Sequence, residues 1–300
     1  MANPAVLGRT AARSRSVFRE GAARILRDPF SVAGLSIYLV LILIAIFADQ
    51  LMTHDPTQIL FRPNGRVANN QPPGGAFLLG TTNLGRDIYS QLVAGSRNAL
   101  MVGLAAAISV AAIGTLIGLL SGYFGGKIDA FLMRLSDVAL AIPFLPFVIV
   151  LSGFFRANTW NVVIAVALVL WPNTARVIRA QVLTVKERAY VEAARVTGAS
   201  DMRILFTHVA PNILPLTFLY GSVAIGWAIL TEAAVSFVGF GDPSRMSWGY
   251  MLQDAFVSQA LSRGSWNWFL PPGICIILVV VAGFFLARGA EEVLFPKLRS

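Results

Sequence analysis

The chain of 300 residues is 56% hydrophobic and only 13% charged, whereas an average soluble protein has about 25% charged residues. This composition excludes an ordinary soluble domain and indicates a membrane protein. The formal net charge of +9 requires no nucleic-acid partner, because basic loops beside anionic lipid headgroups account for it.

Six runs without Asp, Glu, Lys, Arg or His are long enough to cross a bilayer as a helix, which takes about 18 residues. They are 30–48, 98–126, 138–155, 157–175, 209–231 and 264–287. Backbone polar groups in lipid must be bonded within their own segment, so we predict an all-α polytopic protein with six transmembrane helices. The basic leader before the first run is too long for a signal peptide, which makes that run an uncleaved anchor.

Lys and Arg are unevenly distributed among the connecting segments. If the N-terminus lies inside, the inner segments hold 17 of these residues and the outer segments hold 7. Because cytoplasmic loops are richer in Lys and Arg, we expect both termini and the segment between the fourth and fifth runs to be cytoplasmic.

The spans and their orientation predict the domain organisation. In chain order it comprises a cytoplasmic N-terminal tail 1–29, a first transmembrane anchor 30–52, an extracytoplasmic segment 53–97, a core domain of five transmembrane helices 98–288 with a cytoplasmic loop 180–208, and a cytoplasmic tail 289–300.

Residues that carry chemistry are scarce. All six apolar runs lack an ionisable side chain that would form a proton or ion relay. His54 and His208 fall on opposite sides of the membrane in this topology, and Cys275 has no partner cysteine. We therefore expect no metal site and no catalytic residues, so that a driving force for transport must come from another protein.

The second run contains glycines that recur every four residues, at Gly114, Gly118 and Gly122. Small residues at this spacing share one helix face and let two helices approach closely in lipid. We predict helix packing at this face, either within the subunit or, as the alternative, at a subunit interface.

The cytoplasmic loop alternates apolar and charged residues at helical spacing. One apolar stripe is predicted at Val182, Val185, Ala189, Ala193 and Val196. Gly198 suits the positive φ of a helix C-terminus, and Ser200 is placed to cap a second short helix that begins with Asp201. The loop therefore reads as a two-helix knob, with an ordinary amphipathic loop on the inner leaflet as the alternative.

This loop resembles the EAA loop of permease subunits of ABC importers, in which Glu-Ala-Ala is followed by three residues and a glycine. The chain has Glu192, Ala193, Ala194 and Gly198 in that register. The stretch HVAP, ending at Pro211, departs from the general Ile-x-Leu-Pro pattern but is similar to the peptide-importer branch.

Two further stretches are similar to the second permease of dipeptide and oligopeptide importers. The first, LGTTNLGRDIYSQLVAGSRNAL, matches the branch on the extracytoplasmic side at Gly80, Thr81, Gly85, Arg86, Asp87, Ser90, Gly95 and Arg97. The second, SFVGFGDPSRMSWGYML, matches it near an outer gate at Ser236, Gly239, Gly241, Trp248 and Gly249. The C-terminal stretch FFLARGAEEVLFPKL departs from the usual ending of the family.

The resemblance implies a type I ABC importer permease fold in a bacterial cytoplasmic (inner) membrane, with multiple passes through the lipid. It implies as partners a second homologous permease, two ATPase subunits that bind ATP and Mg, and an extracytoplasmic substrate-binding protein, and no nucleic acid. The chain itself would bind no cofactor. The residues implied in coupling to the ATPase are Glu192, Ala193, Ala194, Arg195, Gly198 and Asp201.

The implied solute is a di- or oligopeptide, and nickel chelates, haem and glutathione are alternatives within the same branch. A secondary carrier that needs no ATPase is the alternative from a different class. On the outer side we expect Arg86 and Asp87 either to form an ion pair or to touch the partner directly. We expect Trp248 to lie near the bound binding protein.

Overall fold

The structure, a computed structural model, describes residues 28–155 and 158–294. Its described residues are nearly all helical, as predicted, with isolated β-bridges in place of strands. The helices are α2 Pro29–Ile46, α3 Ala48–Leu51, α4 Ile88–Phe124, α5 Gly126–Ala141, α6 Phe144–Phe154, α7 Thr159–Lys186, α8 Ala189–Val196, α9 Asp201–Ile204, α10 Ala210–Phe237, α11 Trp248–Val257 and α12 Trp266–Leu294. Most of the two predicted tails lies outside the described residues.

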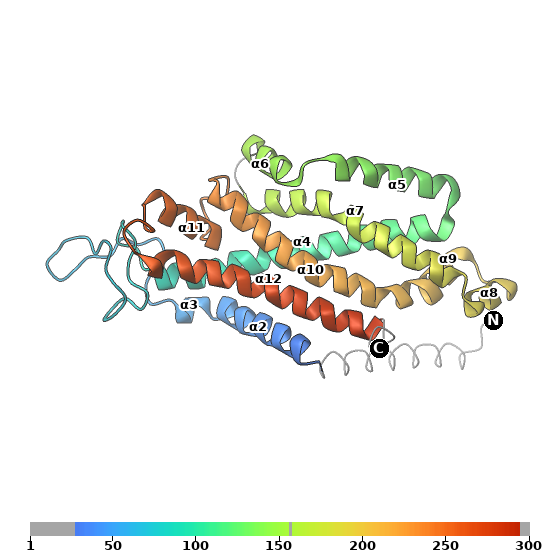
Figure 1. The fold of residues 1–300 in the computed structure, drawn as a ribbon, viewed down its shortest axis with the longest axis horizontal. Helices are drawn as coiled ribbons and strands as arrows, with labels where there is room; N and C mark the ends of the chain where they lie inside the picture. The colour runs from blue at the N-terminus through green and yellow to red at the C-terminus, as the bar shows by residue number, and fades with distance from the viewer. Residues whose placement is uncertain (1–27, 156–157, 295–300) are drawn as a thin grey trace.

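The long helices run lengthwise along one elongated bundle (Figure 1). At one end, called the α8 end, the chain turns through α8 and α9. At the other end, called the α11 end, lie α3, α11 and the irregular segment 52–87. The two regions that the sequence singled out therefore lie at opposite ends of the bundle.

Five helical segments are long and apolar enough to cross a membrane, and a bent pair of helices would make a sixth span. The pair is α5 and α6, which meet at an angle of 81°. The span predicted over 138–155 is therefore interrupted by a bend between α5 and α6. Ile142 precedes Pro143 and is extended, at φ −78° and ψ 124°, because a residue before proline disfavours the helical conformation.

Two ion pairs hold α5 against α7 along its length. The Arg179 guanidinium donates to both carboxylate oxygens of Asp129, at 2.5 and 2.6 Å, and Arg176 donates to Asp137 at 2.6 Å. Charged residues that precede the third apolar run thus join charged residues that follow the fourth, and they hold the two helices together.

The glycine face of α4 packs against α7. A Cβ on Gly114 would lie 2.6 Å from Thr174 Cβ, and one on Gly118 would lie 2.7 Å from the carbonyl oxygen of Ala175. A Cβ on Gly122 would lie 2.8 Å from Val182 Cβ. All three glycines are buried, so the structure places this close approach within the subunit.

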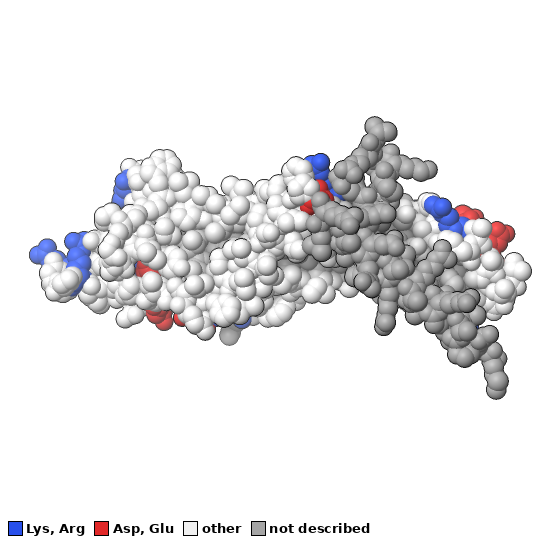
Figure 2. Space-filling model, turned by 90° about the horizontal axis from the view of Figure 1, so that it is seen from below, with Lys and Arg blue, Asp and Glu red and all other residues white. Residues whose placement is uncertain are grey.

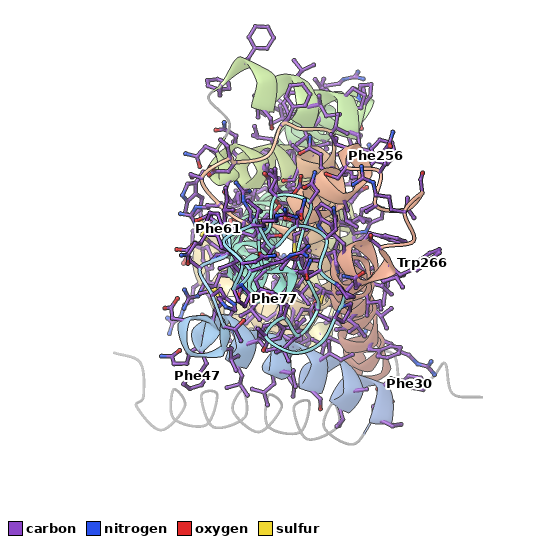
Figure 3. The ribbon with its side chains drawn as sticks, turned by 90° about the vertical axis from the view of Figure 1, so that its left-hand side faces the viewer. Phe30, Phe47, Phe61, Phe77, Phe256 and Trp266 are labelled. Atoms are coloured by element: carbon purple, nitrogen blue, oxygen red, sulfur yellow. The ribbon has the colours of Figure 1, made fainter. Side chains whose placement is uncertain are left out.

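The outer surface is consistent with a lipid environment. Charged side chains visible in Figure 2 gather mostly toward the ends, and most of the surface between them is uncharged. Seen from the α11 end, Phe30, Phe47 and Trp266 project around the bundle's edge (Figure 3), and they are 39%, 50% and 56% exposed. Apolar side chains that face outward in this way suit the hydrocarbon of a bilayer.

Candidate functional site

A short break separates α7 from α8. Helix α7 ends at Lys186, whose ammonium donates to the carbonyl oxygen of Gly122 at 3.0 Å. Arg188 is extended, at φ −73° and ψ 141°, and α8 starts at the next residue. Gly198 then ends the turn after α8 at φ +81°, where a Cβ would meet no atom within 4 Å. The positive φ predicted for Gly198 is confirmed, and backbone conformation alone accounts for the glycine.

The break changes which residues of α8 are buried. Val191 is fully buried beside Val182, Ile204 and Leu205, whereas Ala193 is exposed and Val196 is 83% exposed. The predicted single stripe through Ala189, Ala193 and Val196 is therefore wrong, because the residues between the helices shift the helical phase. The side chains of Ala193 and Val196 instead lie on the outside of α8, where a protein partner can reach them.

Glu192 is exposed in the first turn of α8, and Arg195 lies in its last turn. Each charge lies at the helix end whose dipole favours it. Ala194 is half-buried beneath this face. The residues that match the EAA pattern therefore form one short, rigid element at the tip of the α8 end.

The second helix of the predicted knob is the beginning of the fifth membrane helix. Helix α9 continues through a π-helical turn, Leu205–Val209, directly into α10. Ser200 occupies the N-cap position but makes no side-chain capping bond. Asp201 accepts a hydrogen bond of 2.9 Å from the Tyr123 hydroxyl at the end of α4. The segment that follows α8 is thus continuous with α10 and hydrogen-bonded to α4.

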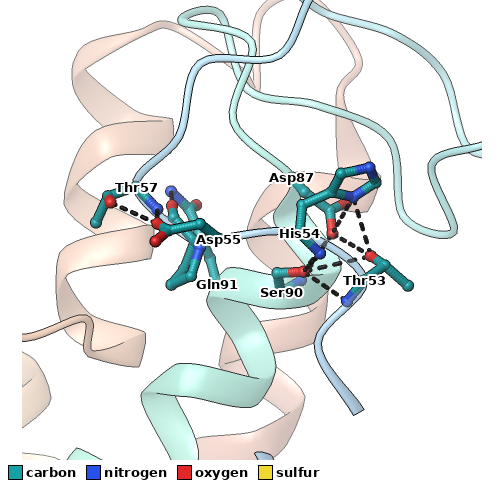
Figure 4. Close-up of polar contacts among 8 residues, drawn as sticks. Thr53, His54, Asp55, Thr57, Asp87, Ser90 and Gln91 are labelled. Atoms are coloured by element: carbon teal, nitrogen blue, oxygen red, sulfur yellow. Dashed lines mark hydrogen bonds and ion pairs between the residues drawn. The ribbon is translucent and has the colours of Figure 1, made fainter. Parts of the chain in front are cut away.

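At the α11 end, Asp87 caps the N-terminus of α4 and holds the segment after α3 (Figure 4). Its Oδ2 accepts from the Thr53 hydroxyl at 2.7 Å and from the Ser90 hydroxyl at 2.6 Å. Ser90 Oγ accepts from the backbone N–H groups of Thr53 and His54, at 3.1 and 3.0 Å. The carboxylate is fully buried, so these bonds fasten the loop to α4.

The neighbouring motif residues shape the same loop. Gly80 and Gly85 have φ of +80° and +76°, which other residues adopt only with strain. The Thr81 hydroxyl is buried, donates to the carbonyl of Ala68 and accepts from the Gln71 N–H at 2.9 Å. These motif positions build a compact loop at the α11 end.

The predicted ion pair between Arg86 and Asp87 is wrong among the described residues, since Asp87 is held by Thr53, Ser90 and His54 instead. Arg86 Nε is buried without a hydrogen-bond partner in the described part of the chain. Burial raises the pKa of the nearby Asp254 carboxyl, and the charge of Arg86 opposes that shift. Arg97 pairs with Asp49 at 2.7 and 2.8 Å.

Replacing Asp87 by alanine is expected to loosen the segment 53–87. The change removes a helix cap, which costs about 0.5–2 kcal/mol, and leaves two hydroxyl groups without their acceptor. Limited proteolysis in membrane vesicles, with protease supplied on both sides, should cut this segment faster in Asp87→Ala than in Asp87→Asn, which keeps an acceptor oxygen. Equal rates for the two variants and the native protein would contradict the role of Asp87.

The outer-gate positions form a closely packed joint around α11. Trp248 is 1% exposed, and its indole N–H donates to the carbonyl of Leu92 at 3.0 Å. Its ring fills the space beside Gly95, where a Cβ would lie 2.7 Å from it. Trp248 is therefore covered by the chain itself, and its place near the binding protein stays a prediction. Gly249 lies against Ala233, where a Cβ would come within 2.4 Å of the carbonyl oxygen.

The two other glycines complete this joint. Gly239 has φ +95° just after the end of α10, and a Cβ on Gly241 would collide with the Ser236 side chain. Ser236 is buried and donates to Glu232 at 2.7 Å. The joint thus combines close backbone approaches with a buried polar group.

Glu232 was missed as a functional residue in the sequence. The apolar run stops at Thr231, but α10 continues to Phe237 within the same membrane-crossing segment, and Glu232 is 4% exposed. The prediction that the spans lack ionisable side chains is therefore wrong. The sequence contains one local signal, because the residues from Ala233 to Phe237 that follow Glu232 are mostly apolar and continue the helix.

Two family profiles match the chain. The profile described as "Binding-protein-dependent transport system inner membrane component" matches residues 114–300, and "N-terminal TM domain of oligopeptide transport permease C" matches residues 16–73. A chain in a solved structure of the MetNI methionine ABC transporter, described as in inward facing conformations, has a similar fold. The TM-score is 0.54 at 18% identity, and the match covers 68% of this chain and 96% of that chain.

Curated relatives match over nearly their whole length. The oligopeptide transport system permease protein OppC of Bacillus subtilis (strain 168) is 33% identical, covering 96% of this chain and 92% of the relative. The glutathione transport system permease protein GsiD of Pectobacterium atrosepticum is 36% identical, covering 95% and 93%. The dipeptide transport system permease protein DppC of Alkalihalophilus pseudofirmus is 33% identical, covering 95% and 91%. The chain therefore belongs to the family of binding-protein-dependent transport system inner membrane components, the membrane subunits of ABC importers.

Proposed function

We propose that this chain is the permease subunit of an ATP-driven importer that moves di- or oligopeptides across a bacterial cytoplasmic membrane. The observation that carries the proposal is the exposed α8, with Glu192 and Val196 on its outer face, standing at the end of helices that run the length of the bundle. Relatives named as oligopeptide and dipeptide permeases support the choice of solute.

In this proposal the α8 end is cytoplasmic and receives the ATPase subunits. ATP and Mg are bound by two ATPase subunits, and this chain contributes no catalytic residue of its own. Closure of the ATPases moves α8, which passes the displacement to α10 through α9 and the π-helical turn. A second homologous permease completes the pathway, and an extracytoplasmic binding protein delivers the solute at the α11 end.

Glutathione is the second candidate solute. It is itself a small peptide, and the relative from Pectobacterium atrosepticum, at 36% identity, is named as a glutathione permease. Nickel chelates and haem have no comparable support among the relatives described above.

The solute can be tested on the binding protein that works with this permease. Isothermal titration with a set of di- and oligopeptides, glutathione, a nickel chelate and haem should give tight binding to peptides. Tight binding to glutathione alone would favour the second candidate, whereas binding only to haem or a nickel chelate would contradict the proposal. Copurification of the permease with two ATPase subunits tests the assembly separately, and a carrier that works alone would not retain them.

A further inference from the structure

A buried carboxylate lies near the α11 end of the bundle, inside a segment apolar enough to cross a membrane. Glu232 of α10 is 4% exposed, and in the described part of the chain no Lys, Arg or His forms an ion pair with it. Burying a carboxylate is costly unless hydrogen bonds compensate for the lost water. Ionisable residues inside membrane segments are rare and usually have a role in function.

The bonds to this carboxylate join separate elements. Asn98 Nδ2 of α4 donates to Glu232 Oε1 at 3.2 Å, and Ser236 of α10 donates to the same oxygen at 2.7 Å. The Ser247 hydroxyl caps the start of α11, the next helix along the chain, by accepting from the Tyr250 N–H at 3.1 Å. One carboxylate thus connects α4 and α10.

The network continues to α7 through a shared hydroxyl. Thr159 Oγ1 lies 3.2 Å from Asn98 Oδ1 and 3.1 Å from Asp242 Oδ2. A hydroxyl has a single proton, so the two acceptors compete for it. Asp242 lies in the connection between α10 and α11. The Thr159 hydroxyl can therefore donate either to Asn98 of α4 or to this connection.

The apolar packing around the network is tight. Trp248 and Met251 of α11 lie in one buried cluster with residues of α4 and α10. Helix α11 also approaches its neighbours closely, with Trp248 on Gly95 and Gly249 on Ala233. A permanently closed joint would be at least as stable with apolar side chains in place of the carboxylate, because buried charges rarely add net stability. The retained polar network is better explained by a joint that must open and close.

We propose that Glu232 is the centre of a latch that holds the α11 end of the permease closed. Its bond to Asn98, together with the bonds of Thr159 to Asn98 and Asp242, keeps α4, α7, α10 and the connection to α11 together, and these bonds separate when that end opens to receive solute. Glu232 and Asn98 are positioning residues in this account. The inference rests on the proposed function, which makes the α11 end the extracytoplasmic end.

The test measures the latch by distance in the complete transporter, reconstituted in lipid nanodiscs without nucleotide or binding protein. Spin labels are attached to cysteines at Trp160 of α7 and Phe256 of α11, which are 50% and 62% exposed, in a Cys275→Ala background. The variants are Glu232→Met and Asn98→Leu, which keep side-chain size but remove the cross-helix bond. Thr115→Val is the matched control, because it removes a bond of 2.9 Å between α4 and α10, to Thr217, far from the α11 end.

Both latch variants should increase the fraction of long label distances about tenfold, the effect expected from losing one to two hydrogen bonds. Thr115→Val should leave the distribution as in the native protein. The proposal is overturned if the latch variants show native distances, if the control shifts equally, or if neither latch variant assembles with the ATPases, which would make the network a folding element. No solute enters this measurement, so a failed latch can be told apart from a wrong solute assignment.

Discussion

Replacing Glu192 by lysine is expected to reduce solute uptake by about tenfold or more while the subunit still assembles in the membrane. Glu192 is exposed on α8 and makes no hydrogen bond or ion pair through its side chain in the described part of the chain, so folding should be little affected. Removing or reversing one partner of a charged contact at a desolvated joint costs about 2–5 kcal/mol. Uptake and ATP hydrolysis by the reconstituted transporter are the measurements.

Glu187→Lys is the matched control for this charge reversal. Glu187 is also exposed and lies in the same loop, but at the C-terminal cap of α7 and outside α8. We expect Glu187→Lys to keep most of the uptake. Normal uptake by Glu192→Lys, or equal losses in the two variants, would remove the special role assigned to α8.

Replacing Gly118 by alanine is expected to destabilise the subunit strongly. The new methyl group would lie 2.7 Å from both the Ala175 carbonyl oxygen and the Ile178 side chain, so α4 and α7 would have to separate. Overpacking of this kind typically costs about 1–3 kcal/mol. Thermal unfolding of the purified subunit in detergent, followed by loss of monodisperse protein, should show a lower midpoint.

Gly273→Ala provides the control for this prediction. Gly273 lies inside α12, and a Cβ there would meet no atom within 4 Å. An alanine in an unobstructed helix position gains about 0.5–1 kcal/mol over glycine. The midpoint should therefore stay or rise in Gly273→Ala, and a fall as large as that of Gly118→Ala would refute the close-packing explanation.

Apolar runs predicted the long helices well, because a bilayer imposes both length and composition on a span. They predicted helix ends poorly. Helix α4 begins at Ile88, where Asp87 caps it, and therefore before the run that starts at Asn98. Arg97 is accommodated inside this helix because its guanidinium bonds to Asp49 and to the carbonyl of Ala45. Because a span was ended at each charged residue, Glu232 was also left outside its helix. Its carboxylate is accommodated by a hydrogen bond from Asn98, which is distant in the sequence.

The coupling loop shows what periodicity resolves and what it does not. It predicted a helix around Glu192 and a turn at Gly198, since both depend on neighbouring residues. It predicted one apolar stripe that continues from Val182 to Val196, but the break at Arg188 resets the helical phase. The hydrogen bond between Asp87 and Thr53 could not be predicted from periodicity either, since Thr53 lies 34 residues away along the chain.

This permease is expected to move peptides only when ATPase subunits act on it. The most direct test is uptake of a labelled peptide into proteoliposomes that contain the permease pair, the ATPases and the binding protein. We expect uptake with ATP and Mg, and none when the ATPase subunits are omitted or ATP is replaced by a non-hydrolysable analogue. Peptide uptake that persists without the ATPases would contradict the claim and identify a secondary carrier.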